Sequence, residues 1–184
     1  KQPDRADFPV NHQPPENGGG MERIIMTKRV LDLLPAELAS LSAKELLQAV
    51  AGSEGRVLAA ETIGITPPLL SDVTNAEFAA SMGADLLLLN MFDVWEPRIV
   101  GLPETRPEDV VRRVKELTGR MIGINLEPVD PAVCAQNEET IWAMSRGRYA
   151  TAENAQRAME MGVDLIVLTG NPGNGVSNEA IVHS

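Results

Sequence analysis

The chain has 184 residues, of which 43% are hydrophobic and 23% charged, and its formal net charge is −10. This is the composition of a globular domain with one core. The acidic balance argues against a nucleic-acid partner, because binding to a phosphate backbone depends on Lys and Arg. The sequence shows neither an apolar run of the roughly 20 residues needed to cross a membrane nor a signal peptide. We therefore expect a cytoplasmic protein with no membrane partner.

The first 26 residues are predicted to be a disordered leader or a non-native extension. Residues 1–20 contain four prolines and three consecutive glycines without a periodic apolar pattern, so they cannot bury enough surface to offset the entropy of ordering. A helical pattern begins at Thr27, and a capped helix is expected after Ser42. The folded domain is therefore predicted to cover residues 27–184, beginning with a short helical cap.

After residue 55, short apolar runs alternate with amphipathic segments. The runs are "RVLAAETI", "ADLLLLN", "MIGINLEP" and "DLIVLTGN", and the segments between them are "TNAEFAASMG", "RPEDVVRRVKELTG" and "TAENAQRAMEMG". Continuous aliphatic runs are typical of parallel strands covered on both faces. Each amphipathic segment starts with a capping residue or lies next to a proline and ends in glycine, as helices do. This alternation predicts consecutive βα units.

Four such units match the first half of an eight-stranded TIM barrel, a fold of about 250 residues. We therefore expect an α/β fold of the (β/α) barrel type with only the first four units present. A flavodoxin-like open sheet is the alternative. A half barrel would leave strand edges unpaired, which predicts that the chain either associates into a homo-oligomer or is unstable. The stretches "SMGADLLLLN" and "EMGVDLIVLTGN" also resemble each other, which indicates units of one kind side by side.

The carboxyl ends of parallel strands form the functional face of such folds. Each predicted strand end carries a carboxylate, an amide or a hydroxyl: Glu61, Asn90, Asp93, Asn125, Glu127, Thr169 and Asn171. We expect Glu61 and Glu127 to be catalytic acids or bases, and Asn90 and Asn125 to bind substrate. Asp93 and Glu127 could alternatively provide oxygen ligands for Mg²⁺.

The glycine-rich loop "GNPGNGVSNEA" follows the fourth predicted strand. Its glycines permit close backbone approach, and exposed N–H groups before the next helix would bind a phosphate or carboxylate. The predicted anion-binding residues are Gly170, Asn171, Gly173 and Gly175. A plain flexible connection is the alternative. Arg146 and Arg148 could also bind an anion, but their loop precedes a predicted helix rather than following a strand.

The stretches "SEGRVLAAETIG", "SDVTNAEFAASMGADLLLLNMFDV", "TGRMIGINLEPVD", "SRGRYAT" and "LTGNPGNGVSNEAI" resemble an uncharacterised bacterial family of TIM-barrel proteins. Members of that family are sometimes labelled haloacid-dehalogenase-like hydrolases, and they are distantly similar to phosphoenolpyruvate-binding barrels. The resemblance implies a barrel and, by the second similarity, Mg²⁺ bound by strand-end carboxylates such as Asp93 and Glu127. The dehalogenase label conflicts with the chain, which lacks the Asp-x-Asp motif of those enzymes.

Two hypotheses for function follow. The first is an enzyme with lyase, isomerase or hydrolase chemistry on a small anionic metabolite, phosphorylated or carboxylate. The second is a non-catalytic barrel that binds or senses a small molecule in the same place. Fold analogy does not choose between them.

Overall fold

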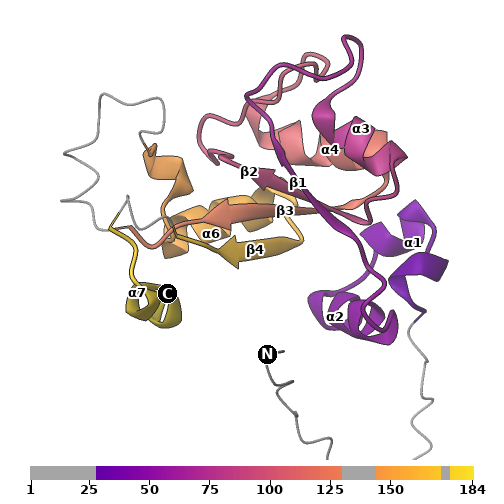
Figure 1. Cartoon of the computed structure of the whole chain (residues 1–184), viewed down its shortest axis with the longest axis horizontal. Coiled ribbons are helices and arrows are strands. Elements are labelled where there is room, and N and C mark those ends of the chain that lie inside the picture. The colour runs from indigo at the N-terminus through magenta and orange to yellow at the C-terminus, as the bar shows by residue number, and fades with distance from the viewer. Residues whose placement is uncertain (1–27, 130–143, 171–174) are drawn as a thin grey trace, which may run out of the picture.

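The structure is a computed structural model that describes residues 28–129, 144–170 and 175–184 (Figure 1). The predicted leader and Cys134 lie outside these residues. The described part contains a parallel sheet, three helices against one face of that sheet and a helical segment at its start.

The sheet has four parallel strands in the order in which they occur along the chain. They are β1 (Ala59–Ile63), β2 (Leu86–Asn90), β3 (Met121–Leu126) and β4 (Leu165–Leu168). A flavodoxin-like sheet would have the order 2-1-3-4-5, so the observed order favours the first of the two predicted topologies. The predicted α/β class and the repeated βα units are confirmed, and closure into a barrel stays a prediction.

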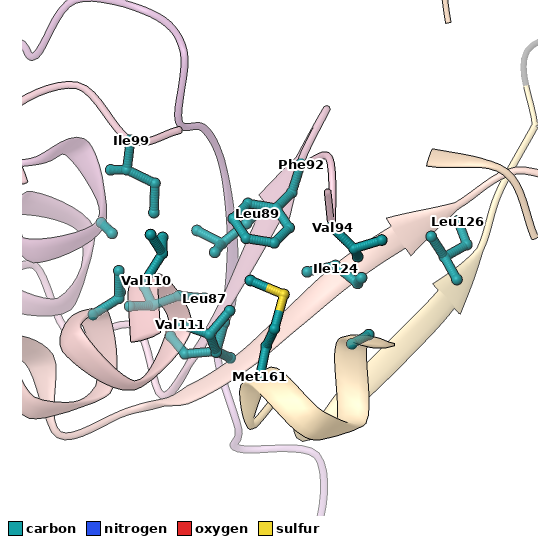
Figure 2. Packing of buried hydrophobic residues seen from close by; sticks show 14 of the residues in the cluster. Leu87, Leu89, Phe92, Val94, Ile99, Val110, Val111, Ile124, Leu126 and Met161 are labelled. Atoms are coloured by element: carbon teal, nitrogen blue, oxygen red, sulfur yellow. The ribbon is translucent and has the colours of Figure 1, made fainter. Parts of the chain in front are cut away.

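Helices α3 (Asn75–Ser81), α4 (Val110–Thr118) and α6 (Ala152–Met161) pack on one face of the sheet. Leu87 and Leu89 of β2 are in register with Ile122 and Ile124 of β3, and all four are almost fully buried. Figure 2 shows Leu87, Leu89 and Ile124 among the side chains that α4 and α6 contribute. A short 3₁₀ turn, Pro107–Asp109, leads into α4. This face is the aliphatic core that the apolar runs predict.

The predicted helix ends are confirmed at atomic detail. The Thr74 hydroxyl caps α3 by accepting from the backbone N–H of Glu77 at 3.1 Å, and the Glu77 carboxylate accepts from the N–H of Thr74 at 2.9 Å. Such a capping box satisfies two N–H groups that the helix leaves free. Gly119 and Gly162 follow α4 and α6 with φ of 65° and 95°, a conformation that glycine adopts without steric cost.

The two similar sequence stretches make the same contact. The Asp85 carboxylate accepts from the backbone N–H of Leu58 at 2.9 Å, just before β1, and the Asp164 carboxylate accepts from Ile122 in β3 at 2.8 Å. Each aspartate lies two residues after the glycine that follows its helix and directly before a strand. Its carboxylate bonds the backbone of the neighbouring strand or of the residue just before that strand. The repeated aspartate therefore aligns each new strand with its neighbour.

The N-terminal segment differs from the prediction. A continuous helical turn was expected from Thr27 to Leu34, but the structure has only a 3₁₀ turn, Val30–Asp32, before α1 (Pro35–Ala39) and α2 (Ala43–Gly52). Pro35 explains the break, because the residue before a proline is driven to extended backbone, and Leu34 has φ −74° and ψ 155°.

This segment packs against the amino ends of the strands. Val30 and Ala49 form a second buried cluster with Met121 at the start of β3, and Leu86 at the start of β2 lies against it. The opposite, carboxyl ends of the strands are therefore left for the loops. The last described helix, α7 (Asn178–His183), follows β4 and is capped by Ser177.

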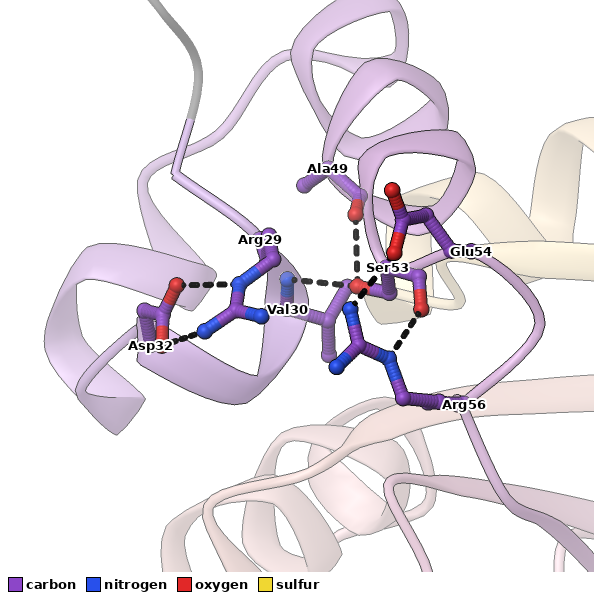
Figure 3. A network of polar contacts seen from close by, with 7 residues as sticks. All are labelled: Arg29, Val30, Asp32, Ala49, Ser53, Glu54 and Arg56. Atoms are coloured by element: carbon purple, nitrogen blue, oxygen red, sulfur yellow. Dashed lines mark hydrogen bonds and ion pairs between the residues drawn. The ribbon is translucent and has the colours of Figure 1, made fainter.

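A buried serine holds the N-terminal segment together (Figure 3). The Ser53 hydroxyl is fully buried, accepts from the backbone N–H of Val30 at 3.1 Å and donates to the carbonyl of Ala49 at 2.8 Å. Arg29 donates two hydrogen bonds to Asp32 nearby, and these lower the pKa of that carboxyl.

Ser53→Ala should lower the free energy of unfolding by about 1–3 kcal/mol, because the buried N–H of Val30 would lose its partner. Urea unfolding measures this. Ser81→Ala is the control: it removes an exposed hydroxyl of α3 that donates to the carbonyl of Phe78 at 2.7 Å, and it should change stability by less than about 0.5 kcal/mol. Equal effects of both changes would contradict the role of Ser53.

Candidate functional site

The face of the sheet opposite the helices carries the predicted polar residues. Glu61 is in register with Leu88, Leu88 with Gly123, and Gly123 with Leu165. Residues in register point to the same face, so this face continues along the strands to Asn90, Asn125 and Thr169. We call these last three residues, with Glu61, Glu127 and Arg148, the edge site.

Glu61 does not lie where it was predicted. It is the third of five residues in β1 and is exposed, rather than lying at the strand end. The Asn90 amide donates to its carboxylate. Asn90 also accepts from the backbone N–H of Met91 at 2.7 Å. Met91 has φ 59°, a left-handed conformation that costs about 1–2 kcal/mol for such a residue, so Asn90 both orients Glu61 and stabilises a strained backbone.

Asn125 is buried, with 8% of its surface exposed, and its amide nitrogen lies 3.2 Å from the Thr169 hydroxyl. Its side-chain oxygen is also buried, and in the part of the chain that the structure describes nothing donates a hydrogen bond to it. A buried acceptor without a donor costs about 1–3 kcal/mol. Asn125 is therefore suited to accept from a bound molecule.

Glu127 forms a buried ion pair with Arg148. Their side chains are 3.0 Å apart, and each residue is 8% exposed. The backbones are joined as well: the N–H of Glu127 donates to the carbonyl of Arg148 at 2.9 Å, and the N–H of Ala150 donates to the carbonyl of Glu127 at 2.8 Å. Sequence reasoning placed the Arg148 loop away from the strand ends. The structure corrects this, because the chain returns and adds Tyr149 as a parallel bridge beside Glu127.

Asn154 in α6 holds the segment that carries Arg148. Its amide nitrogen donates to the carbonyls of Arg146 at 2.7 Å and Tyr149 at 2.9 Å, and its oxygen accepts from the Trp95 indole at 2.9 Å. Asn154 is 4% exposed. Because all of its polar atoms are used within the fold, we assign it a positioning role.

Asp93 fixes the loop after β2 to the same segment. Its Oδ1 accepts from the backbone N–H groups of Trp95 at 2.7 Å and Glu96 at 2.9 Å. Gly147 lies directly against this carboxylate, since a Cβ built on the glycine would come within 1.9 Å of Oδ1. The N–H of Val94 donates to the carbonyl of Gly147 at 3.3 Å. Asp93 therefore joins two loops.

The predicted Mg²⁺ ligands fit a metal poorly. Oδ1 of Asp93 accepts two backbone N–H groups, and Oε1 of Glu127 accepts from Arg148. Among the described residues, no group of three or more His, Cys, Asp or Glu side chains is arranged to hold a metal ion. We derive no step through Mg²⁺.

The glycine loop is described only at its ends. The predicted anion-binding residues Asn171 and Gly173 lie outside the described residues. A Cβ on Gly170 would lie 2.2 Å from Val176, and Gly175 has φ 74°, so both positions require glycine for the course of the chain. Anion binding by this loop stays a prediction.

Comparison with known proteins places the chain in a family. Residues 31–184 match the model described as Domain of unknown function (DUF7916). The chain belongs to this family. No curated protein and no solved structure matches it. Among the described helices, none combines the length and the apolar character that crossing a bilayer requires.

Gly147→Ala should lower the free energy of unfolding by about 1–3 kcal/mol, because the added methyl group overlaps a carboxylate that two N–H groups hold in place. Urea unfolding measures the change. Gly52→Ala is the matched control, since its new Cβ would have only one neighbour, at 4.0 Å, and in a helix this change is expected to stabilise by about 0.5–1 kcal/mol. If Gly147→Ala behaved like this control, the close packing of Asp93 on Gly147 would be wrong.

Proposed function

We propose that the chain is a (β/α) barrel-type domain that binds a small anionic metabolite at the edge site and acts on it as an enzyme of the lyase, isomerase or hydrolase class. The observation that carries this proposal is the buried Glu127–Arg148 pair at the carboxyl end of β3. Taking two charges out of water costs several kcal/mol per ion, so such a pair seldom stabilises a fold more than apolar residues would. Its position at the strand ends, where α/β proteins bind ligands, favours a functional role.

Each residue of the edge site has a role under this proposal. Arg148, held in place by Glu127, pairs with the anionic group of the ligand. Asn125 accepts a hydrogen bond from a hydroxyl or amino group of the ligand. Glu61 is exposed and oriented by Asn90, so it is the better candidate for proton transfer, whereas Glu127 serves as the partner of Arg148.

Three features support the barrel as the frame of this site. The strands follow one another in chain order, the helices α3, α4 and α6 cover a single face, and the N-terminal segment packs at the amino ends of the strands. An open doubly wound sheet would have helices on both faces, whereas the helices described between these strands lie on one face. We include in the proposal a distant relationship to phosphoenolpyruvate-binding barrels, for which this arrangement is expected.

A non-catalytic binding or sensing domain is the second candidate. The observation that favours it is that Asn90 donates to Glu61 and Arg148 donates to Glu127. Both predicted catalytic carboxylates thus already serve as hydrogen-bond acceptors within the fold. The same site would then bind a ligand without converting it.

A thermal-shift screen of phosphorylated and carboxylate metabolites tests the binding site. A ligand present at 100 times its Kd should stabilise the chain by about 2.7 kcal/mol. Asn125→Leu should abolish this response and change the stability of the free chain by less than about 1 kcal/mol, because it removes a buried, unpaired acceptor together with one hydrogen bond to Thr169. The exposed amide of Gln156 in α6 provides the control, and Gln156→Leu should keep the response.

Lack of stabilisation by every anion, or an unchanged response in Asn125→Leu, would contradict the proposal. Once a ligand is known, Glu61→Gln separates the two candidate functions. For an enzyme, NMR should show the ligand converted by the unchanged chain and bound but not converted by the variant. For a binding domain, neither chain converts it.

A further inference from the structure

A pocket of about 170 Å³ lies beside the edge site, between the loops that follow β1 and β2 and the segment that carries Arg148. Ile65 and Met91 provide apolar walls, and Asp93, Glu96, Arg98 and Arg148 provide charged ones. Pockets for drug-sized ligands measure about 300–1,000 Å³. This pocket therefore takes a smaller molecule.

The walls of the pocket are fixed by the contacts described above. Asp93 accepts from the N–H groups of Trp95 and Glu96, and Asn90 accepts from the N–H of Met91, whose backbone is strained. Asn154 donates to the carbonyls of Arg146 and Tyr149, which lie on either side of Arg148 in the sequence. Strained backbone of this kind occurs at functional sites more often than elsewhere. The pocket is thus built before a ligand arrives, which lowers the entropy cost of binding.

Arg148 has donors left for a ligand. Its Nη2 donates to Glu127, and within the described part of the chain this is the one hydrogen bond of the guanidinium. Nε and Nη1 are therefore the donors of this pocket residue that make no hydrogen bond within the described residues. Arg98 is exposed at the rim and adds a second guanidinium, while Glu96, also exposed, presents a carboxylate to the same space.

The charged residues that line the pocket do not favour a simple anion as the ligand. Two guanidinium groups and two carboxylates line it, and Glu127 behind Arg148 already offsets the charge of that guanidinium. An isolated phosphate would be attracted by the arginines and repelled by the carboxylates. A ligand that carries one charge of each sign would satisfy both kinds of group.

We propose that this pocket binds a small zwitterion with a carboxylate and a nearby ammonium group, such as a short aliphatic α-amino acid. The carboxylate pairs with Arg148 and Arg98, the ammonium pairs with Glu96, and the side chain of the ligand contacts Ile65 and Met91. This inference rests on the proposed function, since it names the kind of molecule whose carboxylate would pair with Arg148.

NMR titration of the full chain with four probes tests this proposal. The probes are L-alanine, its hydroxy analogue L-lactate, ethylamine and inorganic phosphate. L-Alanine should bind with the lowest dissociation constant, about tenfold below that of L-lactate, because lactate lacks the ammonium group that forms a charge-assisted hydrogen bond.

Variants at the rim locate the binding. Glu96→Gln should lower the affinity for L-alanine about tenfold and leave the affinity for L-lactate unchanged. Arg98→Gln should lower the affinity for both probes. Glu116→Gln and Arg113→Gln remove the same charges from the surface of α4 and should change nothing. Both Glu96 and Arg98 are exposed, so their variants are expected to fold.

The proposal is overturned if L-lactate or phosphate binds at least as tightly as L-alanine, if L-alanine does not bind, or if Glu96→Gln leaves its affinity unchanged. These results do not decide the proposed function. An anionic metabolite that stabilises the chain through Asn125, and that L-alanine does not displace, would leave the edge site standing while this inference fails.

Discussion

The contact between Glu127 and Arg148 is the interaction on which the arrangement of the site depends. Glu127 joins the carboxyl end of β3 to a segment about 20 residues later along the chain, through backbone hydrogen bonds on both sides and through its side chain. The pairing sets where Tyr149 runs, where Arg148 points and where α6 begins. The loop after β2 then closes onto the same segment through Asp93 and Gly147.

The fold separates its apolar burial from its buried polar groups along the strand direction. Helices α3, α4 and α6 bury the aliphatic face, and the N-terminal segment covers the amino ends. These contacts supply most of the apolar burial, which is the main favourable contribution to folding. The carboxyl ends instead carry features that reduce stability: a buried ion pair, an unpaired amide oxygen at Asn125 and left-handed backbone at Met91. Their concentration at one edge is the observation from which the proposed binding site is argued.

The sequence predicted the local features well and the long-range ones poorly. Helix caps such as Thr74 and stop glycines such as Gly162 act within a few residues, so their patterns are visible in the chain. The repeated aspartates were visible in the sequence as a similarity between two stretches. Their hydrogen bonds to the neighbouring strand could not be predicted, because these bonds form only when the sheet is assembled. The sequence did not place Arg148 at the strand ends, because its loop precedes a predicted helix. The return of the chain beside Glu127 brings Arg148 there. Glu61 lies inside β1 rather than at its predicted place at the strand end, because β1 continues two residues beyond it.

Replacing the ion pair by apolar side chains tests most directly whether it serves function rather than stability. The measurement is the urea unfolding of Glu127→Leu/Arg148→Met beside the two single variants. Each single variant should lose about 3–5 kcal/mol, because the remaining buried charge loses its partner in this ion pair, whereas the double variant should match or exceed the unchanged chain by up to about 4 kcal/mol. A double variant as unstable as the single ones would show that the pair holds the fold together, and the functional account of the edge site would then lose its main support.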